Sequence, residues 1–84
     1  MDIEEVRARI RKMRATGVIP CDPPERIWAG TGGGHRCIGC GGRIASTEVE
    51  YEVELPTGIT IRLHRICHVV WLEVCAEEVA APGV

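Results

Sequence analysis

Two short stretches decide the fold of this chain: HRCIGCGG at residues 35–42 and LHRIC at residues 63–67. Together they supply four metal-ligand side chains in the pattern C-x2-C-x23-H-x2-C, namely Cys37, Cys40, His64 and Cys67. A Cys-x2-Cys pair in a tight turn brings two sulfurs to one metal ion. A histidine and a cysteine three residues apart at the start of a helix lie on one side of its first turn. The spacing therefore predicts one four-ligand metal site.

The chemistry of this set favours zinc, because soft thiolates with one imidazole suit zinc better than magnesium or calcium. Protein side chains fill all four tetrahedral positions, and none stays open for a catalytic water. We therefore expect a non-enzymatic protein with one structural Zn2+ per chain. The N-terminus of the following helix is expected to favour the thiolate form of Cys67. Three arginines near the ligands in sequence are candidates to offset the charge of the site: Arg36, Arg43 and Arg65.

The pair Cys37 and Cys40 also has competing interpretations. A thioredoxin-like redox pair is one of them, but it would need a βαβ context that the sequence lacks, and this CxxC does not open a helix. Disulfides and an iron–sulfur site are the remaining alternatives for the cysteines.

Further residues of ligand type stand elsewhere in the chain. His68 could replace His64 as the fourth ligand, although His64 has the better spacing. His35 is expected in a loop. Neither Cys21 nor Cys75 is expected to bind the metal: Cys75 should lie in the core, and Cys21 stands among prolines, with an exposed or reactive thiol as the alternative.

Residues 48–63 have the pattern of a β-hairpin. Apolar and polar side chains alternate with the period of a half-buried strand on both sides of a turn at residues 56–58. The alternation predicts an outer, solvated face that carries four glutamates: Glu48, Glu50, Glu52 and Glu54.

Two helices are predicted, over residues 2–15 and 65–80. Asp2 can cap the first helix, which presents a short apolar stripe suited to packing on the rest of the domain or, alternatively, to a dimer seam: Ile3, Val6, Ile10 and Met13. The second helix is apolar over most of its circumference, so it needs cover on more than one side. Pro82 and Gly83 are expected to end it.

Residues 16–36 are rich in proline and glycine and are expected to form a connector. The TGGG run at residues 31–34 has neither the lysine nor the hydroxyl of a phosphate-binding loop. Trp28 is expected to fill a groove in the core. The 84 residues then form one domain, in which the helix over 2–15 and the connector precede a zinc-binding core over residues 37–80.

The order of knuckle, hairpin and helix resembles a treble-clef zinc finger, and the ligand spacing is similar to that of the first finger of a LIM domain. The resemblance implies a small α+β zinc-bound domain, treble-clef-like, with an added N-terminal helix. A LIM domain carries a second finger directly after the first, whereas Cys75 stands alone here. The whole chain also resembles small uncharacterised bacterial zinc-finger-like proteins, through its CxGC segment and the stretch from Leu63 to Trp71.

Composition narrows the class of partner. The formal net charge is −2, and residues 27–84 carry seven acidic against four basic side chains, which favours a protein partner over nucleic acid. The arginine-rich helix over residues 2–15 keeps a nucleic-acid-binding or regulatory zinc finger as the alternative. Without a membrane span or a signal peptide, the protein is expected in the cytoplasm, as a monomer or a homodimer. In that reducing compartment, and with an odd count of five, the cysteines are expected to serve a metal rather than disulfides.

Overall fold

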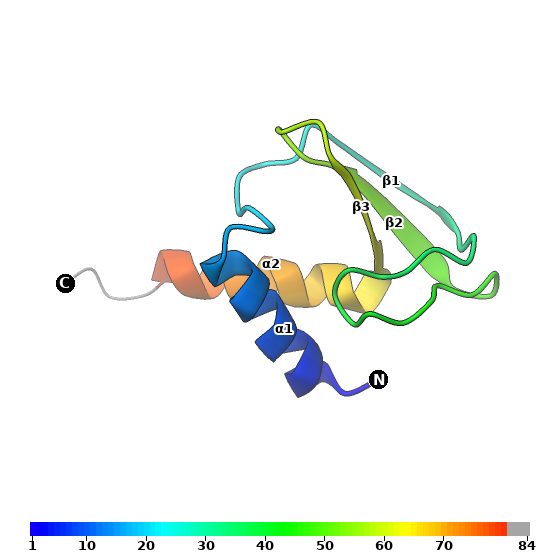
Figure 1. The fold of residues 1–84 in the computed structure, drawn as a ribbon, viewed down its shortest axis with the longest axis horizontal. Helices are drawn as coiled ribbons and strands as arrows, with labels where there is room; N and C mark the ends of the chain where they lie inside the picture. The colour runs from blue at the N-terminus through cyan, green and yellow to red at the C-terminus, as the bar shows by residue number, and fades with distance from the viewer. Residues whose placement is uncertain (81–84) are drawn as a thin grey trace.

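Figure 1 shows the fold in the computed structural model, in which residues 1–80 are described. Two helices and three strands follow one another along the chain: α1 (Ile3–Ala15), β1 (Arg26–Thr31), β2 (Val49–Glu54), β3 (Thr60–His64) and α2 (Arg65–Ala80). This is the small α+β arrangement that the sequence predicts. The expected helix end at Pro82 and Gly83 lies outside the described residues. Over the described part of the chain, neither helix is long and apolar enough to cross a membrane.

The first helix begins at the predicted cap. The side chain of Asp2 accepts hydrogen bonds from the backbone N–H groups of Glu4 at 2.9 Å and Glu5 at 3.3 Å, which satisfies donors that the first turn leaves free. Gly17 follows the helix with a φ of +79°, a left-handed value that glycine adopts without strain.

The three strands form one antiparallel sheet in the order β1-β2-β3. The predicted hairpin is confirmed, because β2 and β3 pair in register from Glu50 opposite His64 to Glu54 opposite Thr60. Its turn closes with a hydrogen bond from the N–H of Leu55 to the carbonyl of Ile59, at 2.8 Å.

The first strand corrects the prediction that residues 16–36 are only a connector. Arg26–Thr31 pairs with the free edge of β2 and places Trp28 opposite Glu52. Strand formation here depends on pairing with β2, from Thr31 opposite Val49 to Arg26 opposite Glu54, and a six-residue run flanked by proline and glycine gives little local signal. Trp28 is 46% exposed on this edge strand, so the expectation that it fills a groove in the core is wrong.

The core lies around α2, which is packed against α1 on one side and against β2 and β3 on the other (Figure 1). The stripe of α1 is used for packing within the chain, with Val6 and Ile10 buried. These residues meet a shared set of buried side chains that includes Val53, Leu63, Val70, Trp71 and Val74. The second helix is therefore covered on two sides, as its composition requires.

One member of the predicted glutamate face is not solvated. Glu50 is buried, because the glycine-rich loop before the knuckle folds over it. Its carboxylate lies 3.4 Å from the backbone nitrogen of Gly33, 3.3 Å from Nδ1 of His35 and 3.6 Å from Nε of Arg62. These groups offset the cost of burying a carboxylate. His35 is in a loop, as expected.

The basic side chains of α1 turn largely toward α2. Each of three arginines forms an ion pair with a glutamate of that helix, with nitrogen–oxygen distances of 3.0–3.3 Å: Arg7 with Glu73, Arg11 with Glu77 and Arg14 with Glu78. Pairs at a partly exposed surface contribute little stability individually. They do, however, commit these arginines to contacts within the chain.

Candidate metal centre

The first half of the site is a tight knuckle between two single bridging residues, Arg36 and Arg43. Inside it, the N–H of Cys37 donates to the carbonyl of Gly42 at 2.7 Å, and the N–H of Gly41 donates to the carbonyl of Cys37 at 2.8 Å. Gly41 takes a φ of +77°, which a side chain would oppose. The CxGCGG sequence thus turns the chain back sharply and directs the thiols of the pair to one side.

The knuckle is held against the rest of the fold by hydrogen bonds to the backbone at its tip. The N–H of Ile38 donates to the carbonyl of Arg62 on β3 at 2.9 Å. From α1, Nε of Arg9 donates to the carbonyl of Gly39 at 3.0 Å. Gly39 is also the point of closest approach, because a Cβ added there would lie 2.6 Å from Cβ of Cys67. Only glycine fits between the knuckle and α2.

The second half of the site lies at the junction of β3 and α2. His64 is the last residue of the strand, the helix begins at Arg65, and Cys67 stands in the first helical turn. This junction faces the knuckle. The ligand atoms of Cys37, Cys40, His64 and Cys67 all lie within 4.8 Å of one another, whereas ligand atoms around tetrahedral zinc would be separated by about 3.5–3.8 Å. The four side chains lie close enough to hold a metal ion.

The imidazole of His64 is oriented by the carboxylate of Glu48, which no local sequence pattern places at the site. Its Nδ1 lies 3.3 Å from Sγ of Cys40, and its Nε2 lies 3.2 Å from Oε1 of Glu48. Metal-binding histidines commonly donate their second ring N–H to a carboxylate in this way. The hydrogen bond from the backbone N–H of Ala45 and the contact with His64 both hold the pKa of Glu48 below its usual value.

The other histidines and cysteines do not join the cluster. His68 packs instead between the rings of Tyr51 and Trp71, tilted to the first and edge-on to the second, with centroid distances of 4.9 and 6.0 Å, and burial lowers its pKa. The structure therefore brings His64 to the thiols rather than His68. The same orientation could be anticipated from spacing alone, since a residue directly after Cys67 points to another side of the helix.

Cys37 and Cys67 do not share negative charge equally. A hydrogen bond from Cys67 is the main reason that the pKa of Cys37 is lowered to about 4, helped by the N–H of His64, which donates to Sγ of Cys37 at 3.2 Å. The same hydrogen bond, together with burial, raises the pKa of Cys67. Of this pair, the metal-free cluster therefore places the negative charge on Cys37, whereas a bound zinc ion would hold all three cysteines as thiolates.

The pKa of His64 is set by its burial and by its contacts with Cys37 and Glu48. Burial alone would lower the pKa of its imidazole, but the hydrogen bonds and charges of Cys37 and Glu48 outweigh burial and raise it. An anionic environment thus surrounds the cluster, which is the field that a bound cation requires.

Two of the three arginines near the ligands in sequence, Arg36 and Arg43, bind backbone rather than sulfur, whereas Arg65 is exposed and its side chain has no hydrogen bond or ion pair within residues 1–80. Arg36 donates to the carbonyl of Gly41 at 2.9 Å, and Arg43 donates to the carbonyl of Gly34 at 2.8 Å. The guanidinium closest to the tip of the knuckle is that of Arg9, which also reaches the carbonyl of Ile38 at 3.4 Å. No sequence signal pointed to Arg9, because helix packing brings it there.

The two remaining cysteines form a disulfide between Cys21 and Cys75, with their Cα atoms 5.6 Å apart. This corrects the expectation that the cysteines avoid disulfides. Cys75 is only partly buried, and Cys21 is not a free thiol. The number of cysteines already allowed this disulfide. Of the five cysteines, a site with three cysteines and one histidine uses three, and two remain to pair with each other.

Comparison with known proteins gives no relative. No protein-family model matches the chain, and neither a curated protein nor a solved structure shows significant similarity to it. The LIM-like resemblance therefore rests on the four converging ligand residues alone.

Proposed function

We propose that this protein is a non-enzymatic zinc-binding module that carries one structural Zn2+ per chain. The observation that carries the proposal is the convergence of four protein ligand atoms within 4.8 Å, three of them on thoroughly buried side chains. Such a set completes a tetrahedron without solvent and leaves no position for a substrate or a catalytic water. The order of knuckle, hairpin and helix supports a treble-clef-like architecture for it.

Zinc is the metal that the donor set suits best. Three thiolates and one imidazole are soft ligands, and a tetrahedral set of three sulfurs and one nitrogen is typical of zinc. The contact between His64 and Glu48 adds the carboxylate–histidine arrangement that is common around protein-bound zinc. When bound, the ion supplies four bonds that join the knuckle to the strand–helix junction. In zinc-finger peptides, such binding is worth on the order of 10–16 kcal/mol of folding free energy.

The partner that the surface fits best is another protein. Three exposed aliphatic side chains, Val49, Ile66 and Val69, line one hollow of about 520 Å³ beside His64. Exposed apolar groups around a hollow are typical of protein-binding surfaces. We place the module in the cytoplasm, where reducing conditions keep the thiolates available for zinc.

Two alternatives have weaker support. Nucleic-acid binding through α1 would compete with the ion pairs that Arg7, Arg11 and Arg14 form with α2. Redox chemistry at the CxxC pair would require access to Cys37, which is 1% exposed despite its lowered pKa. A closed structural site explains both the burial and the charge.

Native mass spectrometry of the full chain tests the proposal directly. We expect a mass increment of one zinc ion per chain, its loss with a strong chelator, and a subunit count of one or two. An apoprotein that keeps its secondary structure and thermal stability without metal would overturn it. A gel-shift titration with short DNA and RNA at low salt tests the nucleic-acid alternative, which predicts binding that weakens steeply as salt rises.

A further inference from the structure

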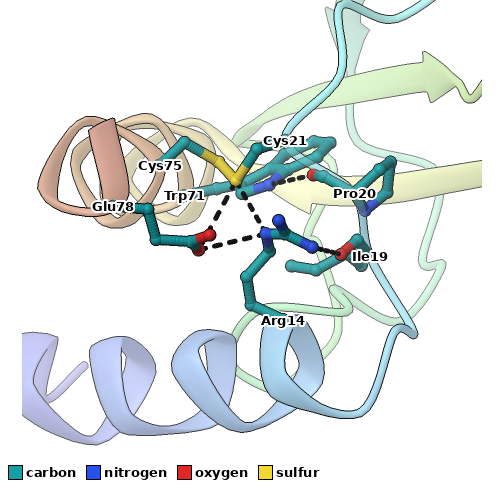
Figure 2. The surroundings of a disulfide bond; sticks show 7 residues. All are labelled: Arg14, Ile19, Pro20, Cys21, Trp71, Cys75 and Glu78. Carbon is teal, nitrogen blue, oxygen red and sulfur yellow. Dashed lines mark hydrogen bonds and ion pairs between the residues drawn. A yellow bond between two sulfur atoms is a disulfide. The ribbon is translucent and has the colours of Figure 1, made fainter. Parts of the chain in front are cut away.

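The disulfide between Cys21 and Cys75 lies in a charged setting that a purely structural bond does not need. Figure 2 shows the side chains of Arg14 and Glu78 against the sulfur of Cys21. Nε of Arg14 lies 2.9 Å from this sulfur, and Oε2 of Glu78 lies 3.7 Å from it. The guanidinium is fixed by the carboxylate at 3.0 Å and by the carbonyl of Ile19 at 3.4 Å. A positioned cation therefore contacts one of the two sulfurs.

The two sulfurs differ in this respect. Within the described residues, no hydrogen-bond donor reaches Sγ of Cys75, whereas Arg14 donates to Sγ of Cys21. In thiol–disulfide exchange, the sulfur whose thiolate is better stabilised is the better leaving group. A cation in contact with a sulfur stabilises its thiolate. The geometry thus makes Cys21 the leaving sulfur and Cys75 the sulfur that is attacked.

The bond is also accessible from one side. A surface pocket of about 300 Å³ is lined by both cysteines, and its walls are mostly apolar: Cys21, Pro23, Pro24, Trp71, Leu72 and Cys75. Leu72 on its rim is 56% exposed. A small thiol can reach the disulfide there without unfolding the chain.

We propose that Cys21–Cys75 is a redox-responsive clasp opened by thiol–disulfide exchange. The thiolate of an external dithiol attacks Sγ of Cys75, the sulfur–sulfur bond breaks, and Cys21 leaves as a thiolate beside Arg14. The second thiol of the reductant then attacks the mixed disulfide and releases Cys75. Two electrons pass from the dithiol to the protein disulfide, the reductant becomes a disulfide, and its two protons end on the two cysteine thiols or in solvent.

This chemistry reconciles the disulfide with the cytoplasmic setting proposed above. Disulfides in reducing compartments are usually transient and redox-sensing rather than permanent. Glu78 opposes the effect of Arg14, since its carboxylate would repel a thiolate at Cys21. The balance of the two charges sets how easily the clasp opens.

Opening the clasp would release the proline-rich segment from α2. That segment is held by the disulfide, by a hydrogen bond from Nε1 of Trp71 to the carbonyl of Pro20 at 3.0 Å, and by the buried side chain of Ile19. Trp71 is 5% exposed beneath it. In this proposal, loss of the covalent bond lets the segment lift far enough to expose Trp71 and an apolar strip of α2, while the four metal-ligand residues stay in place through contacts of their own.

The attacked sulfur can be identified on the wild-type, zinc-loaded chain. Limited incubation with reduced glutathione, acid quenching and peptide mapping locate the mixed disulfide. We expect the glutathione adduct on Cys75. An adduct mainly on Cys21 would overturn the assignment, and this measurement does not depend on the folding of any variant.

Variants then test the role of the charges through the rate of reduction by dithiothreitol. Arg14→Gln should slow reduction about threefold to tenfold, in keeping with the moderate sensitivity of exchange rates to thiolate stability. Glu78→Gln should accelerate it. Arg11→Gln is the matched control, because it loses a pair with Glu77 without touching the sulfur. Equal rates for the Arg14 and Arg11 variants would refute the proposal.

Tryptophan fluorescence tests whether reduction releases the proline-rich segment from α2. In a Trp28→Phe background, Trp71 is the remaining tryptophan, and its emission should shift to longer wavelength on reduction with zinc still bound. Unchanged emission would show that the bond does not act as a clasp. Zinc content, measured in parallel, keeps a failure of this proposal distinct from a failure of the zinc site.

Discussion

Gly39→Ala tests the metal centre with a single methyl group. A Cβ at this position would lie 2.6 Å from Cβ and 3.2 Å from Sγ of Cys67, whereas ordinary contact begins at 3.4 Å. The knuckle and α2 would have to separate by about 0.8 Å. Neither side can yield easily, because the tip of the knuckle is bonded to β3 and to Arg9, and Cys67 is fixed in a helical turn.

We expect Gly39→Ala to lower both the stability of the fold and the affinity for zinc. Overpacking a rigid contact costs about 1–3 kcal/mol, so the free energy of unfolding should fall by that amount. Metal–ligand distances tolerate only about 0.2 Å, so zinc affinity should fall as well. Urea unfolding and zinc competition with a chromophoric chelator measure both. The control is Gly30→Ala, where an added Cβ meets nothing within 4 Å. If the Gly39 and Gly30 variants behave alike, the proposed close packing of the site is wrong.

Three further predictions concern the same fold. Glu48→Ala should lower zinc affinity about 10- to 100-fold, because the imidazole loses the carboxylate that orients it, while Glu52→Ala should leave the chelator-competition curve unchanged. Cys40→Ser should unfold the zinc-binding core by circular dichroism; a fully folded, metal-free variant would contradict this. Trp71→Phe removes the donor to the carbonyl of Pro20 and should lower the free energy of unfolding by about 1–3 kcal/mol in urea under oxidising conditions; an unchanged midpoint and slope would show that the bond is dispensable.

The convergence of the four ligand-type residues and the hairpin could be predicted because local rules fix them. A tight CxGC turn, strict alternation along β2 and β3, and a strand that passes directly into a helix at His64 each leave few conformations. Once the hairpin forms, it has to return His64 and Cys67 toward the knuckle. The spacing of these four residues in the sequence therefore predicts that their side chains converge.

The features that the sequence did not reveal depend on contacts between distant segments. β1 exists because β2 offers a free edge, and Glu50 is buried because a glycine-rich loop folds over it. Arg9 reaches the knuckle only through the packing of α1. Pattern and propensity are local quantities, so they carry little information about such pairings.

The disulfide and the metal site are nested along the chain, and this has a consequence for how the chain closes on itself. Cys21 and Cys75 are 54 positions apart, but the ligands between them span Cys37 to Cys67. Once a metal ties those ligands together, the free path between the two outer sulfurs shortens to about 24 residues. Loop-closure entropy scales as about (3/2)RT ln n, so the effective concentration of one thiol at the other rises about threefold. Metal binding would thus raise the rate at which Cys21 and Cys75 form their disulfide. The ease of disulfide formation would therefore depend on whether zinc is bound.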